Sequence, residues 1–382
     1  MAKVKFGIVG CGNMGRGHAR NFLDGKMPEG EVVAVCDINP KKFDFFEENF
    51  GDSISYFENA EDMFKSGLCD VVMICTPHYF HPSLAILAMD YNLHCIVEKP
   101  AGVYTLQVKE MIERSKTSDK VLGIMFNQRT NPAFKKMKAM IAEGAIGRIK
   151  RTNWIITDWY RTQQYYDSGD WRATWKGEGG GVLYNQAPHN LDLFQWIVGM
   201  SPCKVRAFCH NGKWHNIEVE DDVTCYCEYP NGATGVFITT TGDAPGTNRF
   251  EITGTKGTLL YENGKLYYTK LAVDEREWCM ASSHGFALPE IEKTEVELEG
   301  DNPQHAGICN NVINTILGKE ELYAPAVDGI KGVELANAMH LSSWLGKDVT
   351  LPIDENLYYE ELKARIAISK PHHVNEKTEI QG

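Results

Sequence analysis

The chain has 382 residues, of which 43% are hydrophobic and 24% are charged, the usual range for a globular protein with room for two or three domains. It carries 39 Lys and Arg against 51 Asp and Glu, a formal net charge of −12. This balance argues against a nucleic-acid-binding protein or a basic membrane-surface protein, because both need a positive face toward phosphates.

The cysteines and the apolar segments indicate the cellular compartment in which the protein is expected. The 11 cysteines are scattered, without the fixed spacings of a disulfide framework or a zinc site. No stretch approaches the ~18 uncharged apolar residues of a membrane helix, and the start of the chain lacks the apolar core of a signal peptide. We therefore expect a cytoplasmic protein with reduced thiols, no metal, and neither a nucleic-acid nor a membrane partner.

Short apolar segments alternate with helical patterns over residues 1–125. The apolar segments are rich in Val and Ile, as strands covered on both faces are; they are residues 6–9, 32–36, 71–75, 94–97 and 121–124. Helix-like segments such as 83–91 and 106–115 lie among them. This alternation predicts a doubly wound parallel sheet with right-handed crossovers.

The first predicted strand leads into Gly10-Cys11-Gly12-Asn13-Met14-Gly15. A GxGxxG pattern that follows a strand and opens a helix is the fingerprint of a dinucleotide-binding turn. Gly10 allows the tight turn, Gly12 lets the backbone approach the pyrophosphate, and Gly15 lets helix and strand pack closely. The helix that starts at Asn13 and Met14 supplies free N–H groups for the phosphates. The alternative is a turn whose glycines serve only its geometry.

Asp37 ends the second predicted strand, 22 residues after Gly15. A carboxylate there accepts hydrogen bonds from the adenosine 2′- and 3′-hydroxyls and repels a 2′-phosphate. We therefore expect NAD rather than NADP, although Lys41 and Lys42 follow and leave room for dual use. Asp37 could also cap a helix ahead of Pro40, which is compatible with both roles.

Two further strand ends face the ligand crevice of such a sheet. One is followed by Thr76-Pro77, which would turn the chain beside the cofactor, and by His81, which lies either at the cofactor or only in the first turn of a helix. The other is followed by Glu98-Lys99-Pro100. A lysine after a buried strand can reach a substrate hydroxyl beside the nicotinamide, whereas most surface lysines are only solvated charges.

Aromatic residues and alternating strands replace the regular rhythm from about residue 127. Four of the eight tryptophans lie within residues 154–175, among acidic, amide and arginine side chains. Aromatic faces with polar neighbours suit a polyhydroxylated ligand, and Asp158 and Tyr160 are candidate substrate contacts. The alternative is a packed sheet edge or an oligomer contact.

The segment 177–192 combines a run of glycines with Asn185, His189 and Asp192. The glycines permit either tight packing or close approach by a ligand. If the following helix begins near Asn185, the three polar side chains share one of its faces. A histidine with such neighbours is a candidate proton-transfer group, although a lone helical histidine is more often structural. Asp192 either orients His189 or caps a neighbouring segment.

The rest of the chain predicts antiparallel strands and two closing helices. Six strand-like segments lie within residues 204–269, and Pro230-Asn231-Gly232 and Glu262-Asn263-Gly264 are hairpin signals. Helices are expected over 303–317 and 327–345. We expect an α+β domain with a large, open-faced, mostly antiparallel sheet over residues 126–382, ending in a loosely held tail at 370–382.

Together these residues resemble the glucose–fructose oxidoreductase / inositol dehydrogenase / MocA (Gfo/Idh/MocA) family. The matching pieces follow in order along the chain to about Pro352: Gly10–Gly15, Asp37, Thr76-Pro77 with His81, Glu98-Lys99-Pro100, Trp171-Arg172, and Gly179-Gly180-Gly181 followed by His189 and Asp192. The resemblance implies a Rossmann domain for NAD and a second domain that holds the substrate and mediates oligomerisation. It also implies that Trp171-Arg172 lie near the nicotinamide and that Lys99 and His189 are catalytic.

The chain departs from the family pattern at one position that bears on the chemistry. Many sugar and cyclitol dehydrogenases of the family place an aspartate four residues before the histidine, where this chain has Asn185. An amide cannot take a proton or stabilise an imidazolium as a carboxylate can. His189 then acts without that charge, relies on Asp192, or leaves proton abstraction to Lys99. The family also often has Asn in place of His78.

We therefore expect an NAD-dependent dehydrogenase that oxidises a secondary hydroxyl of a sugar, glycoside or cyclitol, specifically C3 of a glucoside. His189 accepts the proton, Lys99 stabilises the developing alkoxide, and Asn185 positions a neighbouring hydroxyl. The rivals are a redox-neutral enzyme that cleaves or isomerises a transiently oxidised sugar, a non-catalytic NAD- and sugar-sensing protein, and a biliverdin- or imine-type reductase. A homo-oligomer, expected to be a tetramer, completes the prediction.

Overall fold

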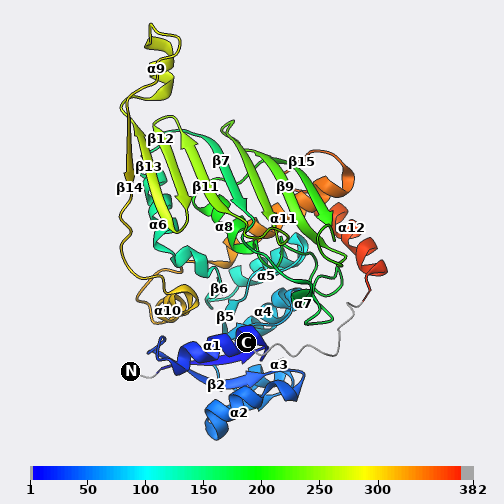
Figure 1. The fold of residues 1–382 in the computed structure, drawn as a ribbon. Helices are drawn as coiled ribbons and strands as arrows, with labels where there is room; N and C mark the ends of the chain where they lie inside the picture. The colour runs from blue at the N-terminus through cyan, green and yellow to red at the C-terminus, as the bar shows by residue number, and fades with distance from the viewer. Residues whose placement is uncertain (1–2, 371–382) are drawn as a thin grey trace. The chain divides into compact units, whose positions relative to one another are not determined.

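The computed structural model describes residues 3–370, which form two compact units (Figure 1). The first unit contains the chain up to Thr130 and returns to it with Asn302–Val333. The second unit contains Asn131–Asp301 and, within the described residues, 334–370. The tail expected at 370–382 lies, apart from Lys370, outside the described residues.

The first unit is built on a six-stranded sheet in the order β3-β2-β1-β4-β5-β6. All neighbouring strands are parallel, which confirms the predicted doubly wound sheet. The strands are β1 (Val4–Val9), β2 (Gly30–Cys36), β3 (Ser55–Phe57), β4 (Val71–Ile74), β5 (His94–Val97) and β6 (Leu122–Ile124). Every residue of β4 is buried, as expected of a central strand covered on both faces. The prediction missed β3, which is short and half-exposed.

Most helices of the first unit lie between its strands in the sequence. They are α1 (Asn13–Leu23), α2 (Asp44–Phe50), α3 (Ala60–Lys65), α4 (His81–Asp90), α5 (Thr105–Lys116) and α10 (Gln304–Ile316), with short 3-10 helices η1 (Pro40–Lys42), η2 (Gly51–Ser53), η3 (His78–Phe80) and η4 (Asn127–Thr130). Late in the chain, α10 contributes Val312 and Ile313 to the core of this unit. The buried Arg129 anchors the same late segment, because its guanidinium contacts Asp328 at 2.9 Å and the carbonyl of Tyr323 at 3.2 Å.

The second unit is built on a nine-stranded sheet in the order β14-β13-β12-β11-β7-β10-β9-β8-β15. Its strands are β7 (Ile149–Ile156), β8 (Lys204–Asn211), β9 (Glu220–Glu228), β10 (Thr234–Thr240), β11 (Asn248–Gly254), β12 (Gly257–Glu262), β13 (Lys265–Leu271), β14 (Ile291–Glu295) and β15 (Val349–Thr350). The β7–β10 pair is parallel and the other pairs described in this sheet are antiparallel. The sheet is therefore mostly antiparallel, as predicted.

One face of this sheet carries the core and the other is open. Phe194 packs against Phe237 with ring centroids 5.5 Å apart. Phe208 and Tyr226, on the opposite face, are 51% and 41% exposed. The helices are α6 (Pro132–Ala142), α7 (Gln163–Tyr166), α8 (Pro188–Trp196), α9 (Glu275–Ala281) and α12 (Glu355–Ile368), and α11 (Ala326–Leu345) begins in the first unit and ends in the second. No helix within residues 3–370 is long and apolar enough to cross a membrane.

The central strand β7 corrects the interpretation of the aromatic stretch. Trp154 lies on β7, is fully buried and stacks on Phe250 with ring centroids 4.1 Å apart. Tyr166 and Trp175 are each only 4% exposed. These three side chains are therefore core residues and not part of a ligand surface.

Candidate active site

The glycine-rich turn has the geometry of a dinucleotide-binding turn. Gly10 has a φ of 97°, and a Cβ on it would lie 2.6 Å from the carbonyl oxygen of Cys75. A Cβ on Gly15 would lie 2.1 Å from the carbonyl oxygen of Gly10. Gly12, at the N-terminus of α1, faces open space, because a Cβ added there would have no atom within 4 Å. Helix and strand thus pack through Gly15, and Gly12 leaves the backbone of the turn open to a phosphate group.

Asp37 follows β2 beside this turn. Its carboxylate accepts hydrogen bonds from the backbone N–H groups of Cys11 at 2.8 Å and Asn39 at 2.9 Å. A carboxylate has about four acceptor positions, so it can still accept from ribose hydroxyls. The alternative role of Asp37 as a helix cap is taken by Asn39, whose side chain caps η1 by accepting a hydrogen bond from Lys41 N. The residues that would hold NAD therefore fit it.

His81 joins the chain segments that follow β4 and β5. Its imidazole is 1% exposed, with Nε2 at 2.7 Å from the carbonyl oxygen of Thr76 and Nδ1 at 2.8 Å from that of Pro100. Burial lowers the pKa of His81, and the two carbonyls oppose that shift. A neutral ring donates from only one nitrogen. The imidazole of His81 therefore lies between the two segments and, when neutral, donates to the carbonyl of one of them; His78, three residues earlier, is also buried.

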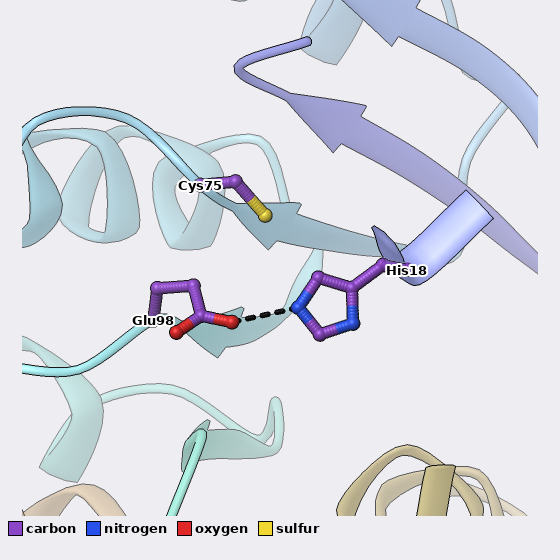
Figure 2. Close-up of side chains that lie close together, drawn as sticks. All are labelled: His18, Cys75 and Glu98. Atoms are coloured by element: carbon purple, nitrogen blue, oxygen red, sulfur yellow. Dashed lines mark hydrogen bonds and ion pairs between the residues drawn. The ribbon is translucent and has the colours of Figure 1, made fainter. Parts of the chain in front are cut away.

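Glu98, the residue immediately before Lys99, forms a buried pair with His18. Figure 2 shows the imidazole of His18 and the carboxylate of Glu98 facing one another, and the two atoms are 2.6 Å apart. Burial alone would raise the pKa of Glu98, but the hydrogen bond from His18 and the charges of His18, His305 and Lys99 bring it to about 2. The second oxygen of Glu98 accepts from the backbone N–H of Lys99 at 3.2 Å.

Cys75 lies beside this pair, so that three potential metal ligands are within 4.8 Å of one another (Figure 2). Two ligands of a tetrahedral zinc ion are about 3.3 Å apart, given bonds of about 2.0–2.2 Å. The 2.6 Å contact of His18 with Glu98 is shorter and has the length of a charge-assisted hydrogen bond. Burial also raises the pKa of the Cys75 thiol well above its usual range. The cluster is therefore a hydrogen-bonded pair next to a neutral thiol.

The segment that carries His189 differs from the prediction at its start. Helix α8 begins at Pro188, so Asn185 lies in the preceding turn and does not share the helix with His189 and Asp192. A proline lacks an N–H and is favoured at the first helical position, which sets this start. His189 is half-buried in the first turn of α8, and Asp192 is 2% exposed on the same helix.

The glycines before this helix serve packing. A Cβ on Gly181 would lie 1.9 Å from the carbonyl oxygen of Glu220, and one on Gly180 would lie 2.3 Å from the ring of Tyr184. The fully buried carboxylate of Glu220 accepts from the backbone N–H groups of Gly181 at 2.8 Å and Leu183 at 3.1 Å. The carboxylate of Glu220 thus holds the backbone of this turn through two hydrogen bonds.

Asn185 belongs to a hydrogen-bonded row of side chains. Arg172 donates to the hydroxyl of Tyr165 at 3.0 Å, and that hydroxyl donates to Asn185 Oδ1 at 3.1 Å. The amide nitrogen of Asn185 donates to Glu178. The guanidinium of Arg172 also lies 4.7 Å from the ring centroids of both Tyr165 and Trp171. Polar groups and aromatic faces therefore meet here, while Asp158 and Tyr160 are exposed.

Both units of the chain match one protein family. Residues 4–126 match the family description "Oxidoreductase family, NAD-binding Rossmann fold", and residues 134–260 match "GFO/IDH/MocA C-terminal domain". The chain belongs to the Gfo/Idh/MocA family. The first unit is accordingly an NAD-binding Rossmann domain of an oxidoreductase, which confirms the cofactor expected from Gly10–Gly15 and Asp37.

The names of several relatives in the Gfo/Idh/MocA family refer to sugars and polyols. Levoglucosan dehydrogenase of Pseudarthrobacter phenanthrenivorans is 28% identical over 68% of this chain and 74% of its own length. Myo-inositol 2-dehydrogenase of Thermotoga maritima is 24% identical over 68% of this chain and 75% of its own length. The WlbA dehydrogenase of Bordetella pertussis, solved with NADH and UDP-GlcNAcA, has a TM-score of 0.77 and 27% identity, and covers 92% of this chain and 100% of its own.

Sequence reasoning missed several residues that support the Gfo/Idh/MocA site. His18 and Glu178 are buried side chains whose partners lie 80 and seven residues away in the sequence. A signal was present for Glu178, which stands immediately before the run Gly179-Gly180-Gly181. For His18 the pattern of α1 shows only one polar residue on a buried helix face.

Proposed function

We propose that this Gfo/Idh/MocA oxidoreductase transfers hydride from a secondary hydroxyl of a sugar, glycoside or cyclitol to NAD, with C3 of a glucoside as the specific position. Residues 1–125 hold NAD in this proposal, and residues 126–382 hold the substrate. The glucoside rests on the exposed or half-buried rings of Tyr160, Tyr165 and Trp171, because sugar C–H faces stack on aromatic faces.

The observation that carries the proposal is the position of Lys99. The ends of four parallel strands lie at one edge of the first sheet, where they present the glycine turn, Asp37, Thr76-Pro77 and Lys99. Ligands bind at the carboxyl edge of such sheets. The ionised Glu98 precedes Lys99 and stabilises a positive charge on its ammonium.

Each proposed catalytic group has a distinct task. Bound NAD supplies the hydride acceptor. His189 accepts the proton of the substrate hydroxyl, and Lys99 donates a hydrogen bond to the same oxygen while negative charge develops on it. Asn185 hydrogen-bonds a neighbouring hydroxyl. The cofactor contacts are Gly10, Gly12, Asn13, Met14, Gly15, Asp37, Thr76, Pro77, His81, Glu98, Lys99, Trp171 and Arg172, and the further substrate contacts are Asp158, Tyr160 and Trp171.

The relatives support a sugar or polyol as the substrate. The names of levoglucosan dehydrogenase and myo-inositol 2-dehydrogenase refer to polyhydroxylated compounds, and the WlbA structure contains UDP-GlcNAcA. A secondary hydroxyl is common to these compounds. We therefore expect a secondary hydroxyl on the substrate of this chain as well.

We further propose a cytoplasmic homo-oligomer, a tetramer in its specific form. All 11 cysteines are free thiols, which supports a reducing compartment.

Helix α9 projects beyond the ends of β12–β14 (Figure 1) and buries none of its own residues. Met280, Phe286 and Leu288 in and after α9 are 83%, 103% and 78% exposed, as apolar side chains that another subunit covers are.

A substrate screen tests the function. The purified protein is incubated with NAD and with inositols, monosaccharides and glucosides at alkaline pH, and NADH absorbance and product masses are recorded. We expect NADH together with a product two hydrogens lighter, greatest for a glucoside. Consumption of a glycoside without net NADH would replace the dehydrogenase by a redox-neutral enzyme. Absence of turnover with every polyol would overturn the proposal.

A further inference from the structure

The buried carboxylate of Glu178 connects two segments that both carry proposed site residues. Glu178 is 2% exposed. One of its oxygens accepts from the backbone N–H of Ala173 at 2.7 Å, and the other accepts from the side-chain amide of Asn185. Ala173 follows Trp171-Arg172 directly and has a φ of 51°, a left-handed conformation that few residues with a side chain adopt. Glu178 thus holds a strained turn and an amide at once.

The hydrogen bond to Glu178 determines which way the Asn185 amide points. A carboxylate is only an acceptor, so the NH₂ group of Asn185 must face Glu178. Its Oδ1 then faces the hydroxyl of Tyr165 at 3.1 Å and the amide of Gln186 at 3.2 Å. The row from Arg172 through Tyr165 and Asn185 to Glu178 is therefore directional, from a cation to a buried anion.

This row explains the asparagine that departs from the family pattern. An aspartate at position 185 would put a second carboxylate in hydrogen-bonding contact with Glu178. Two carboxylates at that distance cannot both be ionised without strong repulsion, so one of them keeps a proton. In this chain the carboxylate lies at position 178 and accepts a hydrogen bond from the amide of Asn185. Asn185 and Glu178 are a matched pair of donor and acceptor.

We propose that Glu178 is a positioning residue for the reaction: it fixes the orientation of the Asn185 amide and holds the turn that carries Trp171-Arg172. This inference rests on the proposed function, in which Asn185 contacts a substrate hydroxyl. It follows that exchanging the amide and the carboxylate between positions 178 and 185 conserves the pair.

Exchange of the carboxylate and the amide between positions 178 and 185 provides a kinetic test. E178Q leaves two amides in contact, and we expect kcat/KM to fall about tenfold or more, because a hydrogen bond to a charged group is lost. N185D places two carboxylates together, and its activity should fall as pH rises through the raised pKa of the pair. The double variant E178Q/N185D restores one amide and one carboxylate, and should recover activity to within about threefold of wild type without that alkaline loss.

Three outcomes would overturn the inference: E178Q with wild-type kcat, KM and pH profile, N185D active at every pH, or a double variant no better than the poorer single variant. E178D, which keeps the carboxylate, should retain more activity than E178Q. Thermal unfolding followed by circular dichroism identifies a variant that has lost its fold, and N185D and the double variant then decide the matter through their pH profiles.

A second readout needs no substrate and separates this inference from the proposed function. In protein labelled with ¹⁵N-asparagine, N185D identifies the side-chain amide resonances of Asn185 by their loss. The pair predicts slow exchange of one amide proton with water, and faster exchange in E178Q. Fast exchange in the wild type would overturn the inference, whereas a wild type that oxidises no polyol yet shows slow exchange would overturn only the proposed function.

Discussion

The imidazole of His18 donates a hydrogen bond of 2.6 Å to the carboxylate of Glu98 (Figure 2). His18 lies on α1, the helix that opens at the glycine turn, and Glu98 lies at the carboxyl end of β5 immediately before Lys99. The pair is almost fully buried, with side chains 1% and 5% exposed. It therefore ties the proposed phosphate-binding helix to the proposed catalytic lysine within one unit.

Replacement of that lysine should abolish turnover. We expect K99A to lower kcat by about a hundredfold or more, because the developing charge on the substrate oxygen loses its donor, while the affinity for NAD changes little. Steady-state kinetics and NAD titration by protein fluorescence measure the two effects. K116A is the matched control, since Lys116 is 57% exposed and pairs with an exposed glutamate on α5. Retention of most activity by K99A would remove Lys99 from the mechanism.

The low pKa of Glu98 predicts how stability depends on pH. Because the folded-state pKa, about 2, is below the ordinary value of 4.5, the carboxylate stabilises the fold above about pH 4.5. This contribution is lost as pH falls from there toward about pH 2. In E98Q the free energy of unfolding, measured by urea titration, should therefore fall less steeply below pH 4.5. E113Q, at an exposed glutamate, should behave like the wild type; equal slopes in all three proteins would refute the low pKa of Glu98.

His81 should support cofactor binding. H81A removes the contacts of both imidazole nitrogens with the carbonyls of Thr76 and Pro100. We expect a loss of about 1–3 kcal/mol in the free energy of unfolding, since a carbonyl loses its hydrogen-bond donor, and weaker NAD binding. Urea unfolding and NAD titration measure both. Unchanged NAD affinity in a destabilised variant would limit His81 to a role in folding.

Asp37 should determine the choice of dinucleotide. In D37S the carboxylate that repels a 2′-phosphate is gone, and I38R adds a guanidinium at a side chain that is 89% exposed. The ratio of kcat/KM for NAD over NADP should fall about tenfold or more in D37S/I38R. I38A is the control and should keep the wild-type ratio. A double variant that still prefers NAD to the same degree would mean that other residues select the cofactor.

The fold of the first unit is predictable because its signals are local. Strands such as Val71–Ile74 are uninterrupted apolar runs, and the glycine turn is a fixed pattern between a strand and a helix. Strand β7 escapes prediction because four consecutive polar residues, 150–153, precede Trp154 and break the alternation of a strand, so that Trp154 resembles a surface aromatic. Its burial depends on pairing with Phe250, which is 96 residues away, and such long-range packing leaves no local pattern.

The candidate site is predictable only in part for a related reason. The sequence indicates Lys99 and His189 from their positions after a strand and in a helix. The start of α8 at Pro188, and hence the place of Asn185 outside that helix, depends on one proline within a glycine-rich turn. The partners of these residues, His18 and Glu178, are set by tertiary contacts, which no spacing rule reveals.

The most direct test of hydride transfer is the fate of one deuterium. The protein is incubated with NAD and a glucoside that carries deuterium only at C3, and the mass of the reduced cofactor is measured. We predict a cofactor one mass unit heavier than ordinary NADH, in the wild type and not in K99A. Reduced cofactor without deuterium would exclude C3, and the absence of label from glucosides and inositols deuterated at each carbinol carbon would contradict hydride transfer from a secondary hydroxyl.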